Sequence, residues 1–261
     1  MEILMLRSVV AAIAVCGLVT AAEAAPRQGG TKAASEARYR ACMDSVASDA
    51  RKALATAEDW VKAGGGDAAQ HCAAAAQMAL GEYARAADGL QRLAREGGRE
   101  IAGSPVLRAS LLGQAAHAWL AADDPDRAET AASEASALVP TDAGLLVLRA
   151  RARAGQHRLG DALVDLDRAI ALDPKLVDAY VFRASALRQQ RALDQAAVDL
   201  DKALSLDPQH PEALLERGIV RRLQGNDAGA RADWETLTKV APKTAAAESA
   251  RLNLEAMDGG K

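Results

Sequence analysis

Two types of charged residue recur in this sequence at a fixed interval. The residues concerned are Arg149, Arg183, Arg217 and Asp165, Asp199, Asp233. Members of each column stand 34 residues apart, and every aspartate follows an arginine by 16 residues. Because both signs keep the same interval, we expect each arginine to pair with the following aspartate inside a repeated unit, as part of the scaffold. The alternative is a row of arginines that binds acidic partners, since a guanidinium holds a carboxylate in bidentate fashion.

The histidines and cysteines do not form a catalytic or metal-binding pattern. The histidines match neither HxxxH nor HExxH, and they lie far apart at His71, His117, His157 and His210. His71 directly precedes Cys72, but a structural zinc ion normally takes four ligands. Motifs for a nucleophile elbow, a phosphate-binding loop or a dinucleotide site are also missing from the sequence. We therefore expect no enzyme, no metal and no cofactor.

Composition and charge narrow the class of protein further. The chain has 261 residues, a formal net charge of -3 and only 3% aromatic residues, whereas 50% of it is hydrophobic and alanine is abundant. Small side chains suit close helix crossings, and a β-sandwich or barrel would carry more Val, Ile, Thr and aromatic residues. The charge gives no electrostatic case for nucleic acid, and no cluster of Lys and Arg suggests an anionic membrane surface.

Residues 1–24 have the pattern of a cleavable signal peptide. Arg7 supplies a basic start, Val9–Val19 is apolar, and Ala22-Glu23-Ala24 offers the small residues of a cleavage site. Such an apolar stretch is too short to span a bilayer, which takes about 20 residues. We therefore expect export to the periplasm or secretion, no membrane span in the mature chain, and a flexible leader at residues 25–35.

Export would place the remaining cysteines in an oxidising compartment. Cys16 lies within the signal peptide, and the large Val15 before it argues against lipidation. Cys42 and Cys72 remain, and an even number of cysteines outside the cytoplasm favours a disulfide. Closing a loop of about 30 residues would stabilise the folded state by about 3–4 kcal/mol. The alternative is two buried free thiols at helix crossings.

A 34-residue period organises the rest of the chain. Prolines mark its steps, at Pro140, Pro174, Pro208 and Pro242. This period indicates a stacked-repeat solenoid, in which each unit is an apolar helix, a short turn, a second helix and a proline stop. We expect a helical N-terminal cap at 36–66, about five repeats, and a C-terminal capping helix with a tail at 245–261. The repeats are 67–98, 109–142, 143–176, 177–210 and 211–244.

Local signals set the ends of several helices. Ser48 or Asp49 is placed to cap a second helix in the N-terminal cap, and Gly64-Gly65-Gly66 is placed to end it. Ser104-Pro105 has the form of an N-cap followed by proline at the first helical position. We therefore expect the next helix to start near Pro105, rather than a disordered break after the first repeat.

Small residues at fixed places in these units resemble those of the tetratricopeptide repeat (TPR). One stands in the middle of the first helix and another opens the second helix, at Ala116, Ala150, Ala184, Gly218 and at Ala86, Ala128, Ala162, Ala196, Ala230. Tyr180, Trp234 and the closing prolines match further positions, although leucine replaces the early aromatic in other units. The resemblance covers 67–244 and is most specific over 143–244. It implies an all-α, right-handed α-solenoid of antiparallel helix pairs, a TPR-like superhelix whose concave face binds peptides or proteins.

The resemblance also implies which side chains line a groove. By their position on the first helices these are His117, Leu120, Val147, Arg151, Val181, Ser185, Arg188, Leu215, Ile219 and Arg222. The three arginines would form a basic line suited to a peptide with an acidic residue or a free C-terminal carboxylate, unless they are simply solvated. We therefore expect a non-catalytic, monomeric periplasmic scaffold that binds a protein or peptide. The alternative is a soluble receptor for a small anionic solute or envelope component.

Overall fold

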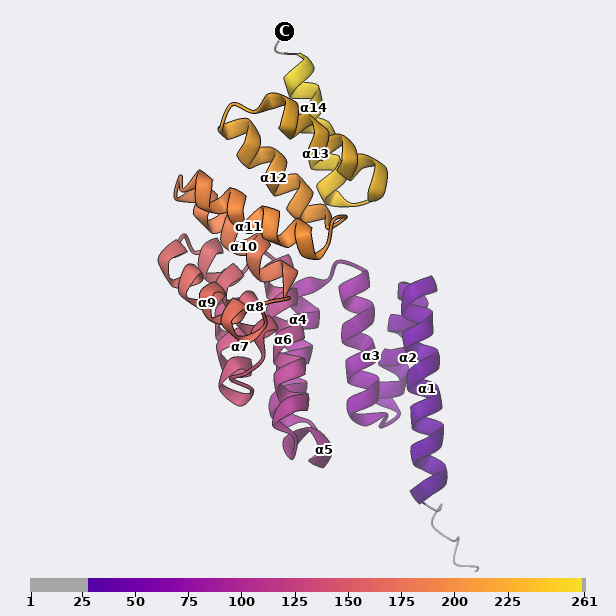
Figure 1. Ribbon diagram of the computed structural model, residues 1–261. Helices are drawn as coiled ribbons and strands as arrows, with labels where there is room; N and C mark the ends of the chain where they lie inside the picture. Colours follow the sequence, from indigo (N-terminus) through magenta and orange to yellow (C-terminus); the bar gives the residue numbers. More distant parts are fainter. Residues whose placement is uncertain (1–27, 260–261) are drawn as a thin grey trace, which may run out of the picture.

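The computed structural model describes residues 28–259, and within that range the chain is helical, without strands (Figure 1). The expected signal peptide and residues 25–27 lie outside the described residues. The helices are α1 (Gln28–Ser48), α2 (Ala50–Lys62), α3 (Gly66–Ala79), α4 (Tyr83–Glu96), α5 (Arg99–Ala102), α6 (Pro105–Ala121), α7 (Pro125–Leu138), α8 (Ala143–Gly155), α9 (Leu159–Leu172), α10 (Val177–Gln189), α11 (Leu193–Leu206), α12 (Pro211–Leu223), α13 (Asp227–Val240) and α14 (Ala245–Asp258).

The turns inside the helix pairs have one backbone feature in common. In the pairs α3/α4, α6/α7, α8/α9, α10/α11 and α12/α13, the same turn position takes a positive φ, and it is occupied by Gly81, Asp123, His157, Arg191 and Gly225. Glycine adopts this left-handed conformation freely, whereas another residue there costs about 1 kcal/mol. The units are therefore equivalent in backbone geometry even where the sequence of the turn differs.

The first helices of the pairs line the inner side of the stack. From α6 onward each first helix contacts the next one, along α8, α10, α12 and α14, whereas successive second helices barely touch. A stack whose first helices approach more closely must curve toward them, and Figure 1 shows the resulting arc. This arrangement is the α-solenoid that the 34-residue period predicts.

The N-terminal cap starts earlier than expected. Helix α1 begins at Gln28, so residues 28–35, predicted to be a flexible leader, are helical. The segment from Lys32 to Ala37 is rich in good helix formers, and it continues the helix that carries Cys42. Asp49 caps α2 by accepting a hydrogen bond from the Lys52 amide at 3.1 Å.

The disulfide between Cys42 and Cys72 is present and joins α1 to α3, with the two Cα atoms 6.3 Å apart. Both cysteines are buried in a small core of their own, together with Ala57 and Ala73. The predicted glycine stop is also present, because Gly64, just beyond the end of α2, has a φ of +82°.

The break after the first repeat is ordered. Ser104 caps α6 by accepting from the Leu107 amide at 3.2 Å, with Pro105 in the first turn, as predicted. The short helix α5 was not predicted. It lies between Gly98 and Gly103, and it places Ile101 in the core with 8% of its surface exposed.

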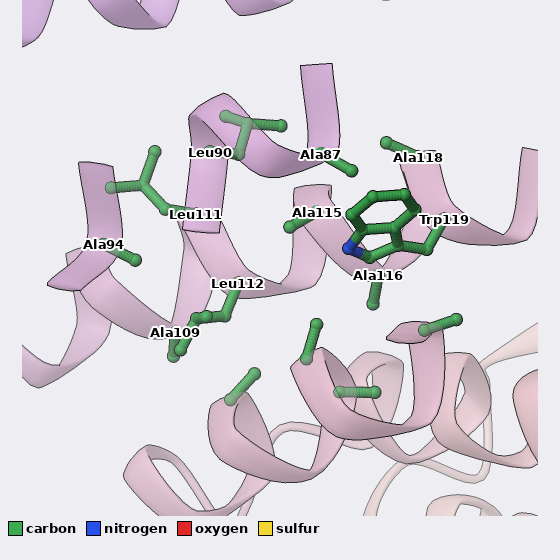
Figure 2. Packing of buried hydrophobic residues seen from close by; sticks show 14 of the residues in the cluster. Ala87, Leu90, Ala94, Ala109, Leu111, Leu112, Ala115, Ala116, Ala118 and Trp119 are labelled. Atoms are coloured by element: carbon green, nitrogen blue, oxygen red, sulfur yellow. The ribbon is translucent and has the colours of Figure 1, made fainter. Parts of the chain in front are cut away.

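Alanine-rich helix crossings make up most of the core. Figure 2 shows α4 against α6, where Ala87 and Leu90 of α4 pack near Ala115 and Trp119 of α6. The Trp119 indole is buried, and its N–H donates a hydrogen bond to the side-chain oxygen Oε1 of Gln91 at 2.8 Å. Small side chains at these crossings let the helix axes approach closely, which fits the low aromatic content.

The repeated arginines pair with the repeated aspartates, as predicted. Arg183 donates from Nε and Nη2 to the two oxygens of Asp199 at 2.8 and 2.6 Å, and the equivalent pairs form in the flanking units. Arg183 also binds Asp167 of the preceding unit at 2.8 Å, a contact between repeats that was not predicted. These arginines therefore belong to the scaffold and are not a row that is free for acidic partners.

Candidate functional site

The predicted groove residues lie on α6, α8, α10 and α12, which line the inner face. The prediction is wrong for two of them, because they are buried. Val147 has 5% and Val181 has 2% of its surface exposed, and each packs in the core beneath the face. His117 and Arg222 are exposed, and the other predicted residues are half-buried. The surface open to a ligand is therefore narrower and more polar than the predicted apolar strip.

The predicted line of three arginines is also incomplete. Arg188 binds both carboxylate oxygens of Glu216 on the next first helix, at 2.7 and 3.2 Å, and Ser185 donates to the same carboxylate at 3.3 Å. Arg222 is exposed and donates to the Asn253 backbone carbonyl at 3.4 Å. The positive charge of Arg188 is therefore neutralised inside the protein.

Arg151 differs from the arginines around it. Its neighbours on the same helix, Arg149 and Arg153, bind Asp165 and Glu129. Arg151 is half-buried, yet it forms no hydrogen bond or ion pair with any residue in the described range 28–259. Its guanidinium carbon lies 4.7 Å from the centre of the Phe182 ring. It is a partly desolvated cation held in place by an aromatic face.

A cleft of about 280 Å³ lies at this point of the inner face. Arg151 lines it together with Leu120 and Ser185, which were predicted, and with Phe182, Asp123 and Gln189, which were not. Phe182 is the single phenylalanine of the chain and follows a predicted position directly. Its place next to Val181 on a first helix was the only sequence signal for its role.

Burial and charge set the protonation of this region. Burial lowers the pKa of Arg151, while the carboxylates of Asp178 and Glu212 act in the opposite direction without coming within ion-pair distance. Although His117 is exposed by surface area, nearby protein atoms partly desolvate its imidazole, and this desolvation and then the charge of Arg151 lower the pKa of His117. His117 is therefore neutral at pH 7, and Arg151 is the cation of the cleft.

Neither a candidate metal site nor a membrane-spanning helix occurs within residues 28–259. No group of three or more His, Cys, Asp or Glu side chains is arranged there to hold a metal ion. None of the helices in that range has the length and apolar character needed to cross a membrane.

Comparison with known proteins bears on the fold. No protein-family model and no curated protein matches the sequence. Among solved structures, TTC0263, a thermophilic TPR protein in Thermus thermophilus, is 19% identical, with a TM-score of 0.60 over 73% of this chain and 97% of that chain. The crystal structure of MamA is 18% identical, with a TM-score of 0.50 over 65% of this chain and 95% of that chain. The chain therefore has a TPR-like fold, and the function must be argued from its own residues.

Proposed function

We propose that this protein is a non-catalytic scaffold that binds an acidic peptide segment in the central cleft, with a peptide carboxylate on Arg151. The supporting observation is that the half-buried guanidinium of Arg151 forms no hydrogen bond or ion pair with any described residue. A desolvated cation is unfavourable unless it is paired, and a ligand carboxylate would supply two charge-assisted hydrogen bonds.

A peptide fits the surface around the cleft better than a small solute does. The cleft, at about 280 Å³, is just below the range for small-molecule sites, roughly 300–1,000 Å³, so it suits one side chain or one chain terminus. Half-buried apolar side chains continue along the inner face beyond it, at Leu215 and Ile219 of α12. A soluble receptor for a small anionic solute or envelope component is the alternative that the same arginine would serve.

We further propose that the scaffold works in the periplasm or is secreted. Support comes from the signal-peptide pattern of residues 1–24 and from the Cys42–Cys72 disulfide, since disulfides persist in oxidising compartments. Cell fractionation followed by N-terminal sequencing of the purified protein tests this. Export predicts a mature chain that starts at Ala25, whereas a full-length cytoplasmic chain would contradict it.

Fluorescence polarisation tests the role of Arg151. The probe is a fluorescein-labelled decapeptide that ends in two glutamates with a free carboxylate. The control peptide has two glutamines in place of the glutamates and an amidated C-terminus. We expect the acidic peptide alone to bind, and Arg151→Gln to weaken it about ten- to a hundredfold, since charged hydrogen bonds contribute about 1.5–3 kcal/mol.

Controls separate binding from folding. Arg92→Gln removes an exposed arginine of α4, outside the cleft, and should leave the affinity unchanged. Arg151→Gln should unfold within a few °C of wild type, because the side chain makes no hydrogen bond or ion pair with a described residue and loses only its contact with the Phe182 ring. Equal affinity of Arg151→Gln and wild type would refute the peptide site. Binding of small dicarboxylates without peptides would favour the receptor alternative.

A further inference from the structure

Two departures from the repeat meet at the N-terminal end of the inner face. The disulfide joins α1 to α3, and the inserted helix α5 lies between α4 and α6. First helices approach one another along the rest of the face, but the backbones of α3 and α6 stay farther apart, and Figure 1 shows the separation. A pocket of about 610 Å³ lies at this opening, and its volume is within the range of small-molecule sites. We call it the N-terminal pocket.

Apolar side chains line one part of the N-terminal pocket. They come from α4, the inserted α5 and α6, and they are Leu93, Ile101, Leu107 and Leu111. Leu107 keeps 41% of its surface exposed. Covering apolar surface of this kind is favourable by about 25 cal/mol per Å². An apolar ligand body would therefore gain mainly by covering Leu107, because Leu93, Ile101 and Leu111 are already buried.

A chain of hydrogen bonds crosses the pocket from α1 to α6. The Tyr39 hydroxyl lies 2.8 Å from His71 Nδ1, and His71 Nε2 lies 3.1 Å from Gln114 Oε1. Burial raises the pKa of Tyr39, so its hydroxyl is protonated at pH 7. Gln114 Oε1 is an acceptor, so in the neutral imidazole Nε2 donates to it and Nδ1 accepts from the Tyr39 hydroxyl. The disulfide lies one turn after Tyr39 and directly after His71, so it holds together the two helices that carry these side chains. This wall is therefore organised before any ligand arrives.

The charges around the pocket are mainly negative. Glu36, Asp67 and Glu100 line it from α1, α3 and α5, against a single Lys32. Asp67 accepts a hydrogen bond from the Gly98 amide at 2.9 Å. Glu36 and Glu100 form no ion pair with any residue of the described part of the chain. With the Tyr39 ring beside them, these carboxylates complement a cation.

We propose that the N-terminal pocket binds a small organic cation with an apolar body, such as an aralkylamine. Its hydrocarbon part lies on the leucines and Ile101, and its ammonium lies near Glu36 and Glu100. This site is distinct from the central cleft, and the inference does not rest on the function proposed for Arg151.

Isothermal titration calorimetry on the oxidised protein at pH 7 tests the N-terminal pocket. The probe is phenethylammonium, and the matched anion is 3-phenylpropionate. We expect saturable binding of the amine only. The double variant Glu36→Gln/Glu100→Gln should weaken it about three- to tenfold, because each exposed charge pair contributes little. Both glutamates are exposed, so the double variant should fold normally.

Two control variants complete the design. Glu255→Gln removes an exposed carboxylate of α14 outside the pocket, and Arg151→Gln removes the anchor of the central cleft. Both should bind the amine like wild type, so a failure of one site is distinguishable from a failure of the other. Equal binding of the anion, no saturable binding of the amine, or full affinity in the double variant would overturn the inference. Binding of basic peptides without the amine would also overturn it, in favour of a peptide site.

Discussion

Arg183 holds two carboxylates that differ in burial, and this difference yields a sharp prediction. The Asp199 side chain has 6% of its surface exposed, whereas that of Asp167 has 64% exposed. Asp199→Asn keeps the shape but removes the charge from a buried pair. We expect the free energy of unfolding to fall by about 3 kcal/mol, because losing one partner of a buried pair typically costs about 3–5 kcal/mol.

The lower end of that range follows from the exposure of Arg183. Its side chain keeps 24% of its surface exposed, so water and Asp167 still solvate the guanidinium after the substitution. Asp167→Asn removes the exposed partner of the same guanidinium. That loss should be below about 1 kcal/mol, as for surface ion pairs in general.

Urea unfolding followed by far-UV circular dichroism measures both variants against wild type. A difference of about 3 kcal/mol corresponds to a melting temperature about 6–12 °C lower. A double-mutant cycle with Arg183→Met isolates the coupling of each pair. Equal effects of Asp199→Asn and Asp167→Asn would refute the assignment of the buried pair to the scaffold.

Three further predictions follow from single sites. Alanine at Gly218 would collide with the Trp234 indole, so Gly218→Ala should lower the free energy of unfolding by about 1–3 kcal/mol. Adding Trp234→Leu gives this unit the same alanine–leucine pair as Ala150 and Leu166, and thermal unfolding should then show that much of the lost stability returns. Arg191 has a φ of +66°, so Arg191→Gly should raise the free energy of unfolding by up to about 1 kcal/mol, and a loss in urea unfolding would contradict the shared turn. The hydrogen bond to Asp178 raises the pKa of His210 in the folded protein. The protonated imidazole therefore contributes its full stabilisation below the pKa of about 6.5 in the unfolded chain, and this stabilisation is lost as the pH rises through the pKa of the folded state. Unfolding measured between pH 5.5 and 8 should show this loss in wild type but not in Asp178→Asn.

The parts that could be predicted from the sequence are those that repeat. The prolines mark the 34-residue units. The start of a helix at Ser104 and Pro105 was also predictable, because N-capping and the missing proline amide act within one helical turn. The Arg183–Asp199 pair was predictable because its partners share one interval. The Asp167–Arg183 pair has the same spacing of 16 residues and could have been found in the same way.

The parts that could not be predicted depend on how neighbouring units fit together. Their position on a first helix suggested that Val147 and Val181 face a ligand. Their burial instead depends on how closely the neighbouring helices pack against them. Arg188 pairs with Glu216, which lies 28 residues later in the chain. Glu216 does not belong to a column that repeats every 34 residues, so the period gave no signal for the pair. Helix α5 is four residues long, too short for a periodic signal.

The column that contains Arg151 shows why function is best sought where the repeat varies. The equivalent positions in the other units hold His117, Ser185 and Ile219, so every unit differs. A scaffold side chain recurs because its partner recurs at the same interval, as the aspartates paired with Arg149, Arg183 and Arg217 do. A side chain in a variable column has no recurring partner to satisfy it. For the half-buried cation Arg151, which forms no ion pair within residues 28–259, the peptide carboxylate proposed above would supply that pairing.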